Sequence, residues 1–257
     1  EIKNNCIVGL IGESGSGKTT LGRCIVKLYE PTEGSVEFNI DGKMIDVVKV
    51  QKKEMKSIRK HFQMLFQDVY SSLDSKMKVG DIVTEPMAIH NVGSKKERID
   101  RAKELMEKVG LSADDIRKYP HQFSGGQRQR IGITRALSIS PDFIICDEPV
   151  SALDVSVQAQ ILNLLLDLQD EFQLSYLFIA HDLGVVKYIS DRIIVMYLGK
   201  IVEIASSEDI YENPRHPYTE ALLAAISKFK AGSSRDILLK GNIPDPSNPP
   251  SGCVLQP

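Results

Sequence analysis

A glycine-rich segment near the start of the chain has the residue types and spacing that bind phosphate groups. Residues 12–19 read G-E-S-G-S-G-K-T and fit the pattern G-x-x-x-x-G-K-[ST]. The glycines let backbone N–H groups turn toward phosphate oxygens, Lys18 can reach the outer phosphates, and the Thr19 hydroxyl can bind Mg²⁺. An ordinary glycine-rich turn would not explain the apolar run before the segment and the helical pattern after it. The predicted phosphate-binding residues are Gly12, Ser14, Gly15, Ser16, Gly17, Lys18, Thr19 and Thr20.

Two neighbouring carboxylates could complete such a site. Asp147 and Glu148 directly follow the apolar run Phe143–Cys146. Because open α/β sheets bind ligands at the carboxyl ends of their strands, Asp147 suits a Mg²⁺ ion and Glu148 can act as a general base on water. Taken alone, an acidic pair after a strand is more often an ordinary turn. Together with Lys18, the pair predicts hydrolysis of a phosphate bond.

The elements that must position these residues alternate between strands and helices. Regular alternation predicts an α/β fold with a mainly parallel sheet flanked by helices, as in P-loop NTPases. Strands are expected at 6–11, 35–40, 61–66, 143–147, 175–180 and 192–198, with a short return strand after Gly199. Helices are expected at about 18–28, 49–60, 94–109, 125–140, 156–171 and 183–189, and near 207–211 and 218–227.

Composition narrows the classes of protein further. The 257 residues include 32 Lys and Arg against 34 Asp and Glu, so no basic field exists to attract nucleic acid. The four cysteines lack the spacing of a disulfide framework or a zinc site, which favours a reducing cytoplasm. The apolar runs are far shorter than the ~18 residues of a membrane span. Because the chain opens on Glu1, we expect the native N-terminus to lie upstream.

A second glycine-containing segment lies between the phosphate loop and the acidic pair. Ser124, Gly125 and Gly126 begin a predicted helix, where a helix cap and an anion site are the same geometry. The run Phe123–Gln127 resembles the signature sequence of ABC ATPases, usually L-S-G-G-Q. In that family two subunits pack head to tail, and each signature covers the γ-phosphate of the ATP held by the other. The resemblance implies that Ser124 and Gly126 act in trans.

Further motifs of this family follow in order. Gln67 resembles the Q-loop glutamine, Ser151–Asp154 resembles the D-loop, and His181 resembles the switch histidine. A lone histidine is usually a surface or hydrogen-bonded residue, but His181 directly follows a predicted buried strand. The resemblance implies ATP and Mg²⁺ as ligands. It implies catalytic roles for Gln67, Glu148 and His181. The implied Mg²⁺ contacts are Thr19, Gln67 and Asp147. The implied nucleotide contacts are Ser124, Gly125, Gly126, Gln127 and Asp154.

Longer runs resemble the ATPases of oligopeptide and dipeptide importers. These runs are Phe66–Leu73, Glu85-Pro86, His121–Arg130, Arg215–Thr219 and Pro249–Cys253. The resemblance implies a peripheral subunit at the cytoplasmic face of the cell membrane. Its implied partners are a second ABC ATPase subunit, two transmembrane permease subunits and an extracytoplasmic substrate-binding protein. The two-ATPase arrangement of peptide importers favours a heterodimer, while a homodimer and a cargo of nickel chelates, glutathione or sugars stay open.

The resemblance also divides the chain and marks departures from the family. Residues 1–78 and 123–206 are expected to form a RecA-like ATP-binding core, 79–122 a helical subdomain running into the signature, and 207–257 a C-terminal extension. Val69 replaces a usual proline, and Asp74-Ser75 replaces Asn-Pro, in the loop expected to grip the permease's coupling helix. With only Cys253 in the tail, no iron–sulfur cluster is expected. The aromatic residue that stacks on adenine is expected upstream of Glu1.

Two other functions deserve comparison with a transport motor. A soluble ABC ATPase acting on nucleic acid or ribosomes would carry a long coiled-coil insertion or a second cassette, yet only 56 residues (68–123) separate Gln67 from Ser124. A catalytically dead regulatory cassette is disfavoured because Lys18, Asp147, Glu148 and His181 are all present.

Overall fold

The computed structural model describes residues 1–227, and its centre is a six-stranded sheet in the order β4-β5-β6-β1-β7-β8. The first five strands in that order run parallel, and β8 runs antiparallel to β7. The expected mainly parallel α/β sheet is confirmed. The strands span β1 Ile7–Ile11, β4 Phe62–Leu65, β5 Phe143–Asp147, β6 Ser175–Ile179, β7 Arg192–Tyr197 and β8 Lys200–Ser206.

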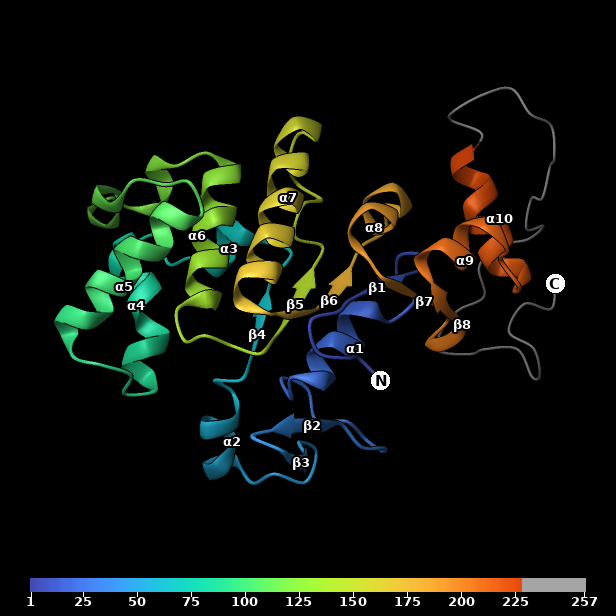
Figure 1. Ribbon diagram of the computed structural model, residues 1–257, viewed down its shortest axis with the longest axis horizontal. Helices are drawn as coiled ribbons and strands as arrows, with labels where there is room; N and C mark the ends of the chain where they lie inside the picture. The colour runs from blue at the N-terminus through green and yellow to red at the C-terminus, as the bar shows by residue number, and fades with distance from the viewer. Residues whose placement is uncertain (228–257) are drawn as a thin grey trace.

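The central strands are apolar on both faces because both faces are covered. Along β1, Ile7 and Ile11 join one buried cluster, while Val8 and Leu10 join a second cluster on the opposite face. Figure 1 shows α7 and α8 on one side of the sheet and α1 on the other. These helices span α1 Lys18–Ile25, α6 Gly125–Leu137, α7 Val155–Phe172 and α8 Leu183–Ile189.

A small antiparallel hairpin accompanies α1 on its side of the sheet (Figure 1). The sequence predicts one strand before Asp41-Gly42, and the structure adds a partner strand after it. Asp41 and Gly42 have φ angles of 50° and 79°, the left-handed pair that a tight two-residue hairpin turn requires. The added strand is short and largely exposed, so it carries little apolar pattern. The elements are β2 Glu37–Ile40, β3 Lys43–Asp46 and the following helix α2 Lys52–Ile58.

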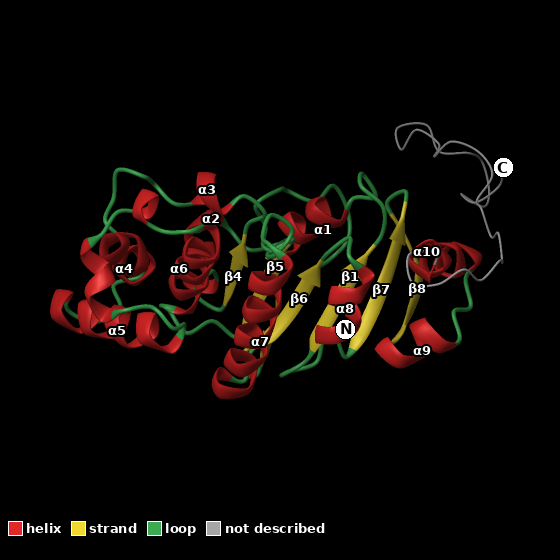
Figure 2. Ribbon diagram, turned by 90° about the horizontal axis from the view of Figure 1, so that it is seen from above, coloured by secondary structure: helices red, strands yellow, loops and turns green. Residues whose placement is uncertain are grey.

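A group of helices lies beyond the β4 edge of the sheet (Figures 1 and 2). The largest of them, α5, starts at a reciprocal cap in which the Ser94 hydroxyl accepts from the Glu97 N–H and the Glu97 carboxylate accepts from the Ser94 N–H. Its buried face, including Leu105 and Met106, continues the apolar cluster on one face of the sheet. The elements are α3 Val69–Ser72, α4 Val79–Ile89, α5 Lys95–Lys108, and the 3₁₀ turns η1 Ala113–Arg117 and η2 Pro120–Gln122.

Two helices, α9 Ser207–Glu212 and α10 Pro217–Ser227, follow β8 at the opposite end of the molecule (Figure 1). The Glu203 carboxylate on β8 accepts hydrogen bonds from the N–H groups of Arg215 and His216, which ties the start of α10 to the sheet. Residues 228–257 of the expected C-terminal extension, including Cys253, lie outside the described residues. None of the helices within residues 1–227 is both long enough and apolar enough to cross a membrane.

Candidate functional site

The loop between β1 and α1 has the backbone that a phosphate cradle needs. Gly12, Gly15 and Gly17 have φ angles of 152°, 82° and 97°, conformations that side chains oppose. A Cβ on Gly12 would lie 2.1 Å from the carbonyl oxygen of Met196 on β7, so only glycine fits there. Ser14, Gly15 and Thr20 are exposed, whereas Ser16 is buried. The loop is therefore packed against the sheet while its tip faces outward.

Lys18 is held beneath this loop by backbone carbonyls. Its ammonium nitrogen donates to the carbonyl oxygens of Gly12 and Glu13, each at 2.7 Å, and the side chain is buried. Burial lowers the pKa of Lys18, although nearby carboxylates, chiefly Glu148 and Asp147, oppose that shift. A positive charge that is partly removed from water and surrounded by acceptors is suited to exchange those acceptors for phosphate oxygens.

Asp147 and Thr19 form the next part of the site. The Thr19 hydroxyl donates to a carboxylate oxygen of Asp147 at 2.9 Å, joining α1 to the end of β5. Asp147 is 1% exposed, and burial raises the pKa of its carboxyl group in spite of the Thr19 hydrogen bond and the charges of Arg23 and Lys18. A buried carboxylate beside a hydroxyl, at the mouth of a phosphate loop, fits a Mg²⁺ ion that also binds phosphate oxygens.

Glu148 is the centre of a three-residue cluster. Its Oε2 atom accepts from the Gln67 amide nitrogen at 3.0 Å and lies 3.2 Å from Nδ1 of His181. Its backbone adopts a φ of 46°, a left-handed conformation that is strained for glutamate, and its N–H donates to Ile179 at 2.9 Å. Gln67, Glu148 and His181 follow β4, β5 and β6, so three adjacent strands deliver them to one edge. Together they line a pocket with Gly125 and Leu153.

The signature segment opens α6 with a reciprocal cap. The Ser124 hydroxyl accepts from the Gln127 N–H at 3.3 Å, and the Gln127 side-chain oxygen accepts from the Ser124 N–H at 2.9 Å. Both residues are exposed, and Gly125 and Gly126 are partly so. Asp154 is the exposed residue that precedes α7, and its side chain makes no capping hydrogen bond. These residues therefore face outward, where a neighbouring molecule could reach them.

One contact to the phosphate loop was not predicted from the sequence. The hydroxyl oxygen of Tyr218, on α10, accepts a hydrogen bond from the backbone N–H of Glu13 at 3.1 Å. The run Arg215–Thr219 marks this segment as distinctive, but nothing in that run points to the loop 205 positions away.

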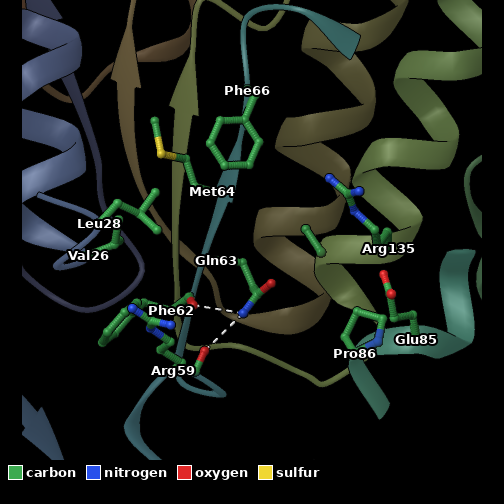
Figure 3. A pocket seen from close by; sticks show the side chains of 11 residues that line it. Val26, Leu28, Arg59, Phe62, Gln63, Met64, Phe66, Glu85, Pro86 and Arg135 are labelled. Atoms are coloured by element: carbon green, nitrogen blue, oxygen red, sulfur yellow. Dashed lines mark hydrogen bonds between the residues drawn. The ribbon is translucent and has the colours of Figure 1, made fainter. Parts of the chain in front are cut away.

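A groove lies between the sheet and the outer helices (Figure 3). Gln63 on β4, Phe66 just after this strand, Glu85 on α4 and Arg135 on α6 line it. The Gln63 amide donates to the carbonyls of Arg59 and Phe62 at its base. Burial lowers the pKa of Arg135, with Glu85 opposing the shift. The groove is thus a mixed apolar and charged surface.

The phosphate loop, the Asp147-Glu148 pair at a strand end and the capped signature helix define an ABC-type P-loop ATPase. Comparison with known proteins agrees with this class. The family described as "ABC transporter" matches residues 1–151, and the family "Oligopeptide/dipeptide transporter, C-terminal region" matches residues 202–257. The chain therefore belongs to the ATP-binding subunits of the ABC transporter family, within its oligopeptide/dipeptide group, and is an ATP hydrolase.

Similar proteins and structures support this assignment. The oligopeptide transport ATP-binding protein OppF of Bacillus subtilis is 58% identical over 220 residues, covering 85% of this chain and 71% of OppF. AppF of the same organism is 49% identical over 258 residues, covering 99% of this chain and 77% of AppF. A peptide import ATP-binding protein of Brucella ovis is 54% identical over 257 residues, covering 100% of this chain and 80% of that protein.

Solved structures show the same fold. The dimeric ATP-binding cassette MJ0796, in a post-hydrolysis state bound to ADP and Pi, has a TM-score of 0.69 and 31% identity, with 80% of this chain and 88% of that chain covered. Clostridium perfringens cbiO1, part of the ABC transporter complex cbiONQ, has a TM-score of 0.74 and 25% identity, with 90% of this chain and 89% of that chain covered. The predicted P-loop NTPase fold is confirmed.

Proposed function

We propose that this ATPase is the motor of an importer for dipeptides and oligopeptides. The cluster of Gln67 and His181 around Glu148, beside the buried Thr19–Asp147 pair, carries the proposal. The names of the relatives support peptides as the cargo. We also propose the domain boundaries expected from the sequence. Residues 1–78 and 123–206 form the ATP-binding core, 79–122 the helical subdomain and 207–257 the C-terminal extension.

The chemistry follows from the positions of the side chains. Loop N–H groups and Lys18 hold the phosphates, and Glu148 accepts a proton from the attacking water while Gln67 and His181 fix the orientation of its carboxylate. Thr19 and Asp147, with Gln67, would hold Mg²⁺, which neutralises charge on the phosphate oxygens when bound. Glu148 combines a left-handed backbone with a side chain that lines the pocket.

The outward-facing signature supports a head-to-tail dimer. In that arrangement Ser124, Gly125, Gly126 and Gln127 seal the ATP of the partner, and Asp154 lies at the same interface. The test is a mixed pair in which one subunit carries Ser124→Arg. The altered signature faces the phosphate loop of the unaltered subunit, so ATP bound at that loop should no longer be hydrolysed. If only the ATP bound at the altered subunit's own phosphate loop is affected, the head-to-tail arrangement is contradicted.

The groove of Figure 3, which Phe66, Glu85 and Arg135 help to line, supports docking of a permease on this surface. We propose a peripheral position at the cytoplasmic face of the membrane, with two permease subunits, a second ATPase subunit and an extracytoplasmic binding protein as partners. Val69, where the resemblance to peptide importers implies a proline, lines the pocket that contains Gln67 and Glu148.

Uptake into sealed vesicles by the complete transporter tests the function. ATP should drive uptake of labelled di- and tripeptides, and Lys18→Ala should abolish both nucleotide binding and uptake. Lys49→Ala is a matched control, because the Lys49 side chain is 81% exposed and pairs with Asp46 away from the loop. If nickel chelates, glutathione or sugars stimulate the ATPase and peptides do not, the peptide proposal is wrong.

A further inference from the structure

A tyrosine of the C-terminal extension forms a hydrogen bond with the backbone of the phosphate loop. Tyr218, the second residue of α10, is fully buried, and its hydroxyl oxygen accepts from the Glu13 N–H at 3.1 Å. Glu13 is the second residue of the phosphate loop. The contact therefore joins the oligopeptide-type C-terminal region to the ABC cassette at its nucleotide site.

The bonded N–H belongs to the peptide group that connects Gly12 to Glu13. The carbonyl of that same group accepts from the Lys18 ammonium at 2.7 Å. Since a peptide group is planar, a hydrogen bond at its N–H fixes the direction of its carbonyl. Tyr218 and Lys18 thus hold opposite edges of one peptide plane, and rotation of that plane would move the lysine's acceptor.

Tyr218 is itself firmly anchored. Its ring lies 4.4 Å from the ring of Tyr197 on β7, and its own N–H donates to Nδ1 of His216 at 3.2 Å. The Glu203 carboxylate fixes the preceding residues by accepting from the N–H groups of Arg215 and His216 at 2.8 and 3.0 Å. Burial raises the pKa of Tyr218 to about 12, so the hydroxyl stays protonated at neutral pH. Contacts to β7 and β8 therefore hold the start of α10, and with it this hydroxyl, against the sheet.

The other side of the loop is also held by the sheet. The Gly199 N–H, in the turn between β7 and β8, donates to the Ser16 carbonyl at 3.0 Å. This contact restrains the later part of the loop, while Tyr218 restrains its first peptide. Without the tyrosine hydroxyl, the Gly12–Glu13 peptide has no comparable restraint on its N–H edge among the contacts of the described residues.

We propose that Tyr218 is a positioning residue for the phosphate site, which acts by fixing the Gly12–Glu13 peptide and, through its carbonyl, the Lys18 ammonium. The inference rests on the proposed role of Lys18 in phosphate binding. This role of Tyr218 makes the affinity for nucleotide depend on the packing of α10 against the sheet. By thermodynamic reciprocity, bound nucleotide must also stabilise the packed position of α10.

Tyr218→Phe in the full chain tests the proposal, since phenylalanine keeps the ring and removes only the hydroxyl. Tyr176→Phe is the matched control: Tyr176 is also fully buried, and its hydroxyl donates to the Leu165 carbonyl at 3.1 Å in the core. Each variant loses one hydrogen bond made by the hydroxyl of a buried tyrosine. For each variant we would measure the Kd for ATP at equilibrium and the steady-state KM and kcat. We would also measure amide hydrogen exchange in the segment 217–224 with and without ATP.

We expect Tyr218→Phe to raise the Kd and KM for ATP about fivefold, the effect of one lost hydrogen bond, with kcat changed less than twofold. ATP should slow amide exchange in residues 217–224 of the parent and of Tyr176→Phe, but much less in Tyr218→Phe. Equal ATP affinities in the two variants, with equal ATP effects on exchange, overturn the proposal.

Lys18→Ala separates this outcome from failure of the phosphate-site assignment. If Lys18→Ala binds ATP as the parent does, the role of the lysine is wrong and the inference falls with it. If Lys18→Ala loses ATP binding while Tyr218→Phe behaves like Tyr176→Phe, only the role of Tyr218 is refuted.

Discussion

Gly126, the second glycine of the signature, packs so closely that one added methyl group should disturb the start of α7. A Cβ at this position would lie 2.5 Å from a methyl carbon of Val157, whereas ordinary contact begins at 3.4 Å. The two groups must therefore separate by about 0.9 Å, and overpacking of this kind costs about 1–3 kcal/mol. Gly126→Ala should lower the free energy of unfolding by that amount.

A second substitution tells packing from any other role. Val157→Ala removes the obstructing methyl group from a half-buried side chain, at about 1 kcal/mol by itself. In the double variant the overlap is gone, so its loss of stability should be at least about 1 kcal/mol smaller than the sum of the single losses. Gly132→Ala, on the same helix with open space around it, is the control and should be neutral or slightly stabilising.

Urea unfolding followed by far-ultraviolet circular dichroism measures these differences, since the chain has no tryptophan for fluorescence. Additive losses in the double variant would refute the steric argument. The ATPase rate of the double variant then has a defined meaning. A rate that recovers with stability assigns Gly126 to packing of α7, and a rate that stays low assigns it to close approach of the partner's γ-phosphate.

Three further predictions concern the catalytic base, the loop and the extension. Glu148→Gln should keep ATP affinity and lower turnover by about 10²–10⁴, because the amide accepts no proton; parental turnover would exclude Glu148 as the base. Gly12→Ala should abolish ATP binding, since its Cβ would lie 2.1 Å from the Met196 carbonyl oxygen; retained affinity would show that the loop can shift. Burial raises the pKa of Glu203, but donated hydrogen bonds bring it below the ordinary 4.5. The stabilising effect of the ionised Glu203 carboxylate is therefore complete above pH 4.5 and is lost as the pH falls through the native pKa. The melting temperatures of the parent and Glu203→Gln should therefore differ at pH 7 and converge in acid. A difference that stays constant with pH would refute this.

The elements with the strongest apolar pattern could be predicted residue by residue. Strand β5 and helix α8 begin and end at the predicted residues, because apolar runs are bounded there by polar or turn-forming residues. Helix α1 instead ends at Ile25, three residues early. Lys27 adopts the left-handed conformation usually reserved for glycine, and its ammonium is held by the carbonyls of Val48 and Val50. That ending depends on a distant segment, which no local pattern can reveal.

The candidate site shows the same limit. The order of motifs along the chain predicts which residues gather at the carboxyl edge of the sheet, and Gln67, Glu148 and His181 do lie together there. Spacing cannot predict which atom of Gln67 faces Glu148. The structure places its amide nitrogen on the carboxylate, so the proposed Mg²⁺ contact would use its other side-chain atom, the carbonyl oxygen. The Tyr218 contact likewise depends on how α10 is folded back.

The groove and the hydrolytic cluster are separated by a single peptide bond. Phe66 lines the groove, and the next residue, Gln67, donates to the carboxylate of Glu148. The Arg135 guanidinium, also in the groove, donates to the Ser72 carbonyl at 2.6 Å and so ties the segment after Gln67 to the helix that the signature caps. We expect a partner that displaces Phe66 or Arg135 in the groove to shift Gln67 or α6, because close-packed interiors transmit displacement. If a permease docks in the groove as proposed, these contacts connect it mechanically to Gln67 and Glu148, the residues proposed to orient and activate water.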